Sequence, residues 1–189
     1  MTEVVLYHHV LGLTDGVRAF ADELRQAGHT VHTPDMFDGQ TFDTIGDGIA
    51  FAREQGFAEL AGRGVAAAEQ IGRDLVYAGF SFGVIPAQQL AQTRPGARGA
   101  LLMYSCLPVS EFGTAWPDGV PVQVHAKADD TEFAEDRAAA DALVASTRDA
   151  ELFLYPGHQH LFADSSASDY DPDAAALLLE RVRRFLDAV

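Results

Sequence analysis

Ser81 stands at the centre of the sequence Gly-Phe-Ser-Phe-Gly, residues 79–83. An apolar run typical of a β-strand, residues 74–78, comes directly before it, and residues 84–93 follow with a helical stripe of apolar side chains. A serine on a sharp strand-to-helix turn has a strained backbone, and glycine two positions before and after it avoids collision with neighbouring backbone. Such a turn exposes the hydroxyl and directs the next N–H, that of Phe82, to where an oxyanion would form. The pattern therefore predicts a nucleophilic serine.

Two residues farther along the chain could complete a site with Ser81. Asp130 and His160 follow it in the order Ser, Asp, His, which is the chain order of the α/β-hydrolase triad. In such a site the histidine takes the serine proton, and the aspartate orients the imidazole and stabilises the imidazolium. The neighbouring His158 and Asp129 are alternative candidates for the base and the acid. The order predicts acyl-transfer chemistry.

Short apolar runs alternate with longer helical patterns along the chain. This alternation is typical of an α/β fold with a mostly parallel central sheet and helices on both faces. We expect one domain, residues 1–189, with strands at 4–8, 30–33, 74–78, 98–104, 120–125 and 151–155 and helices at 17–26, 45–53, 58–71, 84–93, 133–146 and 174–186. The serine, the histidines and the candidate acids directly follow strands, and ligands bind at that edge of an open parallel sheet.

The composition and net charge disfavour several classes of function. A formal net charge of −15 disfavours binding to nucleic acid, because the protein would repel phosphates. No stretch approaches the roughly 20 apolar residues needed to span a bilayer. The one cysteine, Cys106, cannot form an internal disulfide, and the first residues lack the basic and apolar regions of a signal peptide. We therefore expect a cytoplasmic protein that acts on a small molecule; its oligomeric state is left open.

The motifs together resemble the dienelactone hydrolase family, small α/β-hydrolases that lack a large cap. The resemblance covers nearly the whole chain and rests on these segments: His9-Val10-Leu11-Gly12-Leu13, Gly28 with Pro34-Asp35, the elbow at 79–83, His125 five places before Asp130, and Tyr155-Pro156-Gly157 leading to His160-Leu161-Phe162.

The resemblance implies hydrolysis of an ester or lactone through an acyl-enzyme, without a cofactor or metal. It places the oxyanion hole at the backbone N–H groups of Val10 and Phe82. It favours His160 over His158, because the family's histidine is followed by x-Phe, and it favours Asp130 through the spacing from His125. The residues that we expect to line the substrate pocket are His9, Leu11, Phe37, Tyr104, Phe162 and Asp164.

Three positions depart from the family pattern. Ser81 replaces the cysteine of dienelactone hydrolase itself, and His9 replaces a glutamate that holds and activates the thiol. Asp164 stands where an arginine pairs with the carboxylate of the dienelactone substrate. We therefore expect an anionic dienelactone to be a poor substrate, because it would meet a carboxylate in place of a guanidinium.

Other functions stay open at this stage. The fold could be retained without chemistry, giving a small-molecule binding protein, or the same triad could cleave a thioester or an amide. Histidines gather after several strands and could bind a metal, but neither an H-E-x-x-H nor a cysteine pattern is present, and we expect no metal. Cys106 lacks flanking glycines, so we interpret it as buried or pocket-lining rather than nucleophilic.

Overall fold

A computed structural model describes all residues, 1–189, and contains one six-stranded sheet in the order β2-β1-β3-β4-β5-β6. Every neighbouring pair of strands is parallel. The strands are β1 (Glu3–Tyr7), β2 (Thr30–His32), β3 (Leu75–Phe80), β4 (Gly99–Met103), β5 (Val122–Lys127) and β6 (Ala150–Tyr155). The predicted α/β fold with a parallel sheet is confirmed.

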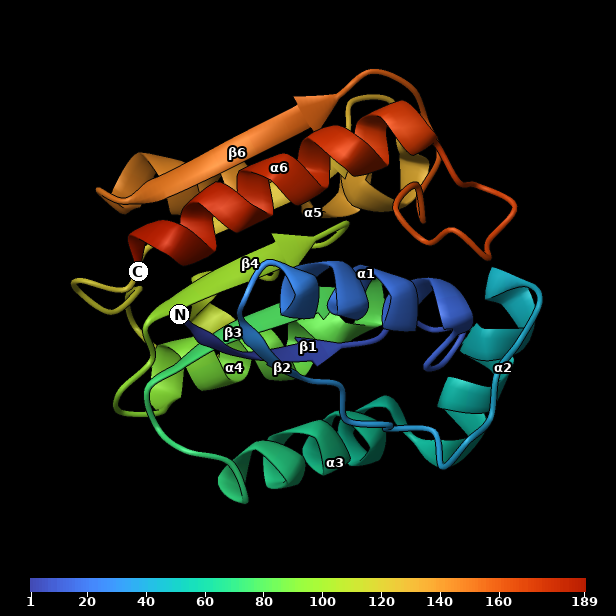
Figure 1. Cartoon of the computed structure of the whole chain (residues 1–189), viewed down its shortest axis with the longest axis horizontal. Coiled ribbons are helices and arrows are strands. Elements are labelled where there is room, and N and C mark those ends of the chain that lie inside the picture. The colour runs from blue at the N-terminus through green and yellow to red at the C-terminus, as the bar shows by residue number, and fades with distance from the viewer.

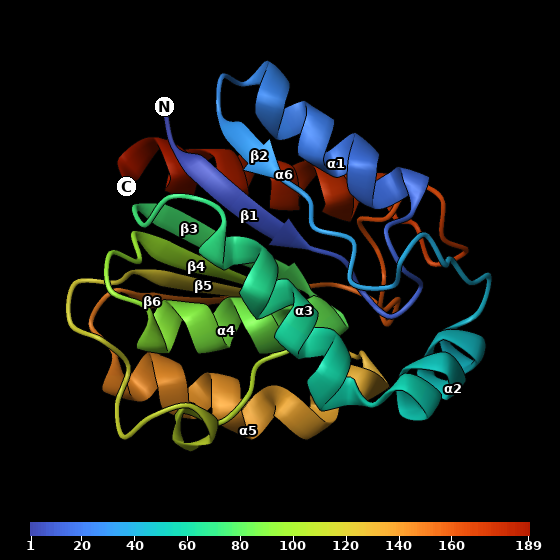
Figure 2. The same ribbon diagram turned by 90° about the horizontal axis from the view of Figure 1, so that it is seen from below.

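Helices cover both faces of the sheet. Figure 2 shows α1 and α6 on one face and α3, α4 and α5 on the other, and Figure 1 shows α2 beyond the carboxyl ends of the strands. The helices are α1 (Asp15–Gln26), α2 (Ile45–Gln55), α3 (Phe57–Glu69), α4 (Val84–Thr93), α5 (Thr131–Ser146) and α6 (Pro172–Ala188), with short 3-10 turns η1 (Ser81–Gly83) and η2 (Val109–Glu111). None of these helices combines the length and apolarity required to cross a membrane.

The central strands are buried on both faces, because helices pack against each side of a parallel sheet. Every residue of β3, β4 and β5 is buried, and these strands belong to one continuous apolar core of 52 buried residues. This rigid centre fixes where each strand ends. Side chains just beyond the strands are therefore held in defined places.

Capping residues determine where α1 and α5 begin. The apolar periodicity of the sequence predicted both starts two residues too late. Asp130 caps α5 by accepting a hydrogen bond from the Glu132 N–H, so the helix begins at Thr131 rather than at Phe133. Thr14 caps α1 in the same manner, through the Val17 N–H. An oxygen-bearing side chain at this position satisfies an N–H that has no acceptor within the helix. The cap on α5 also fixes the position of the Asp130 carboxylate.

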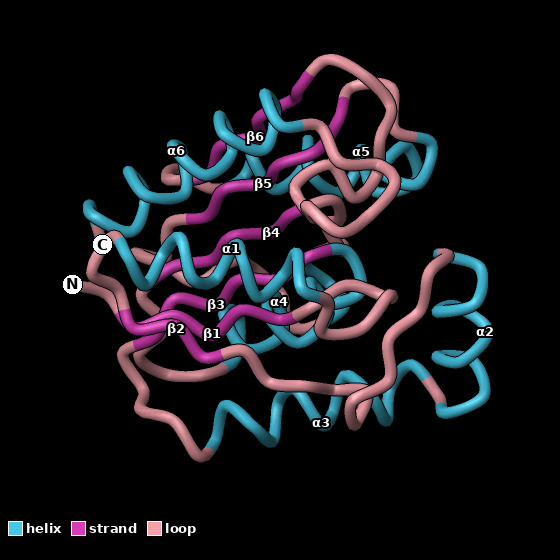
Figure 3. The backbone as a smooth tube through the Cα atoms, turned by 45° about the vertical axis from the view of Figure 1, so that its right-hand side comes forward, coloured by secondary structure: helices cyan, strands magenta, loops and turns pink.

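The strand order reverses between β1 and β3, and the candidate site lies at this point. Tyr7 at the end of β1 pairs with Gly79 in β3, so the loop after β1 lies beside the turn after β3. Figure 3 shows the strands side by side, and the arrowheads in Figure 1 point toward the side where α2 lies. A reversal of strand order opens a crevice at the carboxyl ends of the strands, where α/β proteins bind ligands.

Candidate active site

The turn after β3 has the strained geometry of a nucleophile elbow. Ser81 has a φ of 48°, a left-handed backbone conformation that is uncommon for residues other than glycine. A Cβ on Gly79 would lie 2.1 Å from the Gly83 carbonyl oxygen, and one on Gly83 would lie 2.6 Å from that of Tyr7. The backbone therefore leaves no room for side chains at these two positions. This is the physical reason for the two glycines of the motif.

Ser81, His160 and Asp130 form one chain of hydrogen bonds. The Ser81 Oγ lies 2.8 Å from His160 Nε2, and His160 Nδ1 lies 2.7 Å from Asp130 Oδ2. Asp130 and His160 are buried. The alternatives Asp129 and His158 are exposed. The structure therefore brings together the three residues that the sequence favoured, from the ends of β3, β5 and β6.

Neighbouring groups hold the His160 ring and backbone in place. The His160 N–H donates to Asp169 Oδ2 at 3.1 Å, and the ring packs against Tyr104 with their centroids 5.6 Å apart. The buried Asp130 carboxylate accepts a hydrogen bond from the Nδ1–H, which leaves a lone pair on Nε2 toward the Ser81 hydroxyl. With that tautomer, the imidazole can accept the serine proton.

Two backbone N–H groups near Ser81 are candidates for the oxyanion hole. The Val10 N–H donates to no acceptor in the protein. The Phe82 N–H lies in the first turn of η1, where an N–H has no acceptor within the helix. Val10 and Phe82 line the same pocket as Ser81 and His160. The arrangement can therefore offer two donors beside the serine hydroxyl.

The pocket that contains Ser81 has a volume of about 310 Å³. Its apolar wall comes from Val10, Ile45, Ile49, Phe57, Phe82, Ile85 and Leu107, and its polar residues besides Ser81 and His160 are Arg53, Ser105 and Glu132. Ile45, Ile49 and Arg53 lie four residues apart on α2 and share one face of it. A pocket of this size and apolar lining suits a small organic molecule.

None of the six residues that we expected to line the substrate pocket lies in it. Phe37 is fully buried and packs behind Phe82 with their centroids 5.7 Å apart. Tyr104 stacks on Phe80 in the core, and its hydroxyl accepts a hydrogen bond from the Ala163 N–H. Phe162 is buried against Tyr104. These aromatic residues therefore pack beneath the site and do not line the pocket at Ser81.

The other three expected residues, His9, Leu11 and Asp164, also lie outside the pocket at Ser81. His9 and Asp164 are buried and contact each other at 2.7 Å. Asp164 therefore does not line the pocket at Ser81, which corrects the expectation from the sequence. Leu11 lines a separate polar hollow of about 430 Å³ instead.

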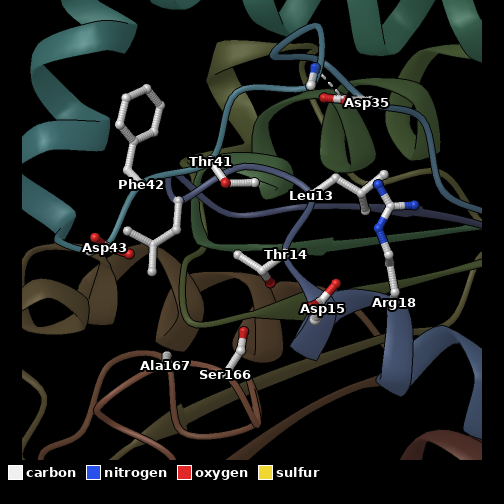
Figure 4. Close-up of a pocket in the computed structure, with 12 residues that line it drawn as sticks. Leu13, Thr14, Asp15, Arg18, Asp35, Thr41, Phe42, Asp43, Ser166 and Ala167 are labelled. Carbon is white, nitrogen blue, oxygen red and sulfur yellow. Dashed lines mark hydrogen bonds between the residues drawn. The ribbon is translucent and has the colours of Figure 1, made fainter.

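The separate hollow lies between α1 and the loop after β2. Figure 4 shows Asp15 and Arg18 of α1 on one side of it and Asp35, whose carboxylate accepts a hydrogen bond from the Gly39 N–H, on the other. Ser81 and His160 are not among its lining residues. It is therefore distinct from the pocket at the nucleophile.

Cys106, His8 and His125 are buried. Burial raises the pKa of the Cys106 thiol to about 12. Burial also lowers the pKa of His8 to about 4 and that of His125 to about 3, so both are neutral near pH 7. No three His, Cys, Asp or Glu side chains are grouped so that they could hold a metal ion.

The model of the dienelactone hydrolase family matches residues 1–189, the full length of the sequence. The chain belongs to the dienelactone hydrolase family. This confirms the resemblance inferred from the motifs, and hydrolysis is the chemistry of the family. A search of curated proteins gives no match.

Solved structures share the fold at low sequence identity. A dienelactone hydrolase-like promiscuous phosphotriesterase from metagenomic libraries is 20% identical with a TM-score of 0.76, over 100% of this chain and 86% of that one. A dienelactone hydrolase from Anabaena variabilis is 17% identical with a TM-score of 0.69, over 99% and 86%. A structure reported for the metagenome-derived lipolytic enzymes LipS and LipT is 16% identical with a TM-score of 0.70, over 100% and 94%. At such identities, similarity establishes the fold alone.

The pocket residues on α2 were missed by the sequence reasoning. The stripe formed by Ile45, Ile49 and Arg53 was present in the sequence as a helical pattern, but nothing local indicated what it faces. The stripe reaches the pocket at Ser81 only because α2 lies beyond the carboxyl ends of the strands. The signal available in the sequence was an apolar stripe that ends in an arginine.

Proposed function

We propose that this hydrolase cleaves a small carboxylic ester or lactone through an acyl-enzyme on Ser81, with His160 as the base and Asp130 orienting His160. The observation that carries the proposal is the hydrogen-bonded chain of these three side chains, whose serine opens into an apolar pocket. A binding protein would not need a strained serine aligned with a histidine of the correct tautomer.

The proposed reaction has two stages, formation and hydrolysis of an acyl-enzyme. The Ser81 Oγ attacks the carbonyl carbon while its proton passes to His160 Nε2. The negative charge on the carbonyl oxygen is stabilised by the N–H groups of Val10 and Phe82. When the tetrahedral intermediate collapses, the alcohol oxygen leaves with the proton from His160. Water, deprotonated by His160, then releases the acid and restores Ser81.

The pocket limits the substrate to a small and mainly apolar molecule. Its volume is about 310 Å³, at the lower end of the range for ligand sites of roughly 300–1,000 Å³. Arg53 and Glu132, the two charged residues of its wall, are both exposed and of opposite sign, so neither charge dominates. We therefore expect neutral esters to be preferred over an anionic dienelactone, in a protein whose net charge is −15.

A substrate panel tests the proposed reaction class. Short-chain aryl esters, lactones, thioesters, amides and the dienelactone would be supplied to the wild type and to Ser81→Ala. The proposal predicts turnover of neutral esters or lactones that disappears in the variant. Preference for thioesters or amides would reassign the substrate class, and a dienelactone kcat/KM equal to that of the aryl esters would refute the charge preference. Turnover that survives in Ser81→Ala would refute the nucleophile.

A further inference from the structure

His9 and Asp164 form a buried pair behind the loop that carries Val10. His9 follows β1, Asp164 lies four residues after His160, and neither side chain is more than 2% exposed. His9 Nε2 lies 2.7 Å from Asp164 Oδ2. His9 stands where the family pattern has a glutamate, and Asp164 where it has an arginine. These two changed positions are thus in direct contact. They connect the loop after β1 to the loop that holds the catalytic histidine.

The Asp164 carboxylate is held as an anion by several donors. The Thr14 hydroxyl donates to Oδ2, and the backbone N–H and hydroxyl of Ser166 both donate to Oδ1, at distances of 2.5–2.7 Å. Burial would raise the pKa of this carboxyl, but the hydrogen bonds from His9, Ser166 and Thr14 outweigh burial and hold the pKa well below its usual range. The group accepts hydrogen bonds and donates none.

The contacts of His9 fix which of its nitrogens carries the proton. An anionic carboxylate at Nε2 requires a proton on that nitrogen. The Leu11 N–H donates to Nδ1 at 3.3 Å, which requires a lone pair there. His9 is therefore neutral with its proton on Nε2. The ring joins the Asp164 carboxylate to the backbone of Leu11, the residue after Val10.

We propose that Asp164 is a positioning residue for the oxyanion hole and acts through His9. The carboxylate fixes the tautomer of His9, and the ring then holds the Leu11 N–H and with it the turn that directs the Val10 N–H to the Ser81 site. This turn has a further hydrogen bond of 3.0 Å, from the Gly12 N–H to the His9 carbonyl. The inference rests on the proposed function, since it concerns the same reaction.

Asp164→Asn is the first test, because it keeps the size of the side chain. The amide oxygen is expected to remain with the two donors of Ser166, which turns the NH₂ toward His9 Nε2. His9 must then move its proton to Nδ1 and lose the Leu11 hydrogen bond. Removal of one oxyanion donor lowers kcat by about 10²–10³-fold, so we expect a loss of roughly 10–100-fold from a displaced donor, with KM within about threefold.

Two substitutions of His9 separate positioning from a purely structural role. His9→Asn keeps an acceptor where Nδ1 lies but does not reach Asp164, whereas His9→Gln keeps a donor to Asp164 but offers no acceptor to Leu11. The proposal predicts the higher kcat in His9→Asn. A structural role predicts the reverse order, because His9→Gln satisfies the buried carboxylate. Ser165→Ala is the matched control: Ser165 is exposed and directly follows Asp164 in the chain without hydrogen bonding to its carboxylate, so this substitution should leave kcat unchanged.

The ¹⁵N chemical shifts of His9 in the wild type and in Asp164→Asn give a readout that does not depend on activity. The expected result is a protonated Nε2 and a bare Nδ1 in the wild type, exchanged in the variant. An unchanged tautomer, an unchanged kcat in a folded Asp164→Asn, or a higher kcat in His9→Gln would overturn the positioning role while leaving the proposed function intact. A wild type without esterase activity or Ser81 labelling would overturn both.

Discussion

Replacing Asp130 with asparagine should abolish most of the activity without unfolding the protein. Asp130 uses its two carboxylate oxygens for different tasks: Oδ1 accepts from the Glu132 N–H at 2.9 Å and caps α5, while Oδ2 lies 2.7 Å from His160 Nδ1. The amide oxygen of asparagine can keep the cap. Its NH₂ group then faces Nδ1 and forces the proton of His160 onto Nε2.

The magnitude follows from that change of tautomer. With a proton on Nε2, the ring directs an N–H at the Ser81 oxygen 2.8 Å away and cannot accept the serine proton. The same substitution in a serine protease triad lowers kcat by about 10⁴-fold, which corresponds to roughly 5 kcal/mol of transition-state stabilisation. We expect a loss of this order for Asp130→Asn, with thermal unfolding close to that of the wild type because the cap is retained.

The assay is the steady-state hydrolysis of a short aryl ester, with Asp129→Asn as the matched control. Asp129 precedes Asp130 in the chain, is exposed and makes no contact with His160, so its substitution should leave kcat within about twofold. A folded Asp130→Asn protein that keeps more than a tenth of the wild-type kcat would refute the reasoning. So would a larger loss in Asp129→Asn.

Three other predictions concern buried groups and the pocket. Burial lowers the pKa of His8 to about 4 and of His125 to about 3 from an ordinary value of 6.5, so below about pH 6.5 the unfolded chain binds protons that the folded protein does not. The free energy of unfolding in urea should therefore fall by roughly 2 kcal/mol per histidine between pH 7 and pH 5, and His125→Gln should remove about half of this dependence; a pH-independent stability would contradict it. The Cys106 thiol, whose pKa is raised to about 12 by burial, should react with iodoacetamide only after denaturation, and rapid labelling of the native protein would show that it is accessible. Ile49→Trp should fill the pocket and lower the ratio of kcat/KM for butyrate over acetate esters by about tenfold or more, whereas an unchanged ratio would place the acyl group elsewhere.

The sequence was sufficient to predict the fold and the three residues of the candidate triad. The elbow is a local feature, since the glycines around Ser81 are required by contacts with backbone in and beside the turn. Asp130 and His160 could be found because they lie in the segments that follow strands of a parallel sheet, and the ends of such strands meet at one edge.

The pocket could not be predicted, because its walls depend on packing between distant segments. Phe37 and Phe162 were predicted to line the substrate pocket because they are aromatic and lie in or beside loops. Both are instead buried in the core. The pocket residues of α2 reach Ser81 only because of where that helix packs, and the sequence of α2 does not specify its position. The contact between His9 and Asp164 joins residues 155 positions apart, and no local pattern reports it.

Labelling with a fluorophosphonate probe, with the adduct located by mass spectrometry, tests most directly whether Ser81 is the nucleophile. The hydrogen bond from Ser81 to His160 and the opening of the serine into the pocket predict one adduct per chain, on Ser81. The adduct should disappear in Ser81→Ala and remain in Cys106→Ala. Failure of the folded protein to react, or an adduct at any other residue, would contradict this account of the site.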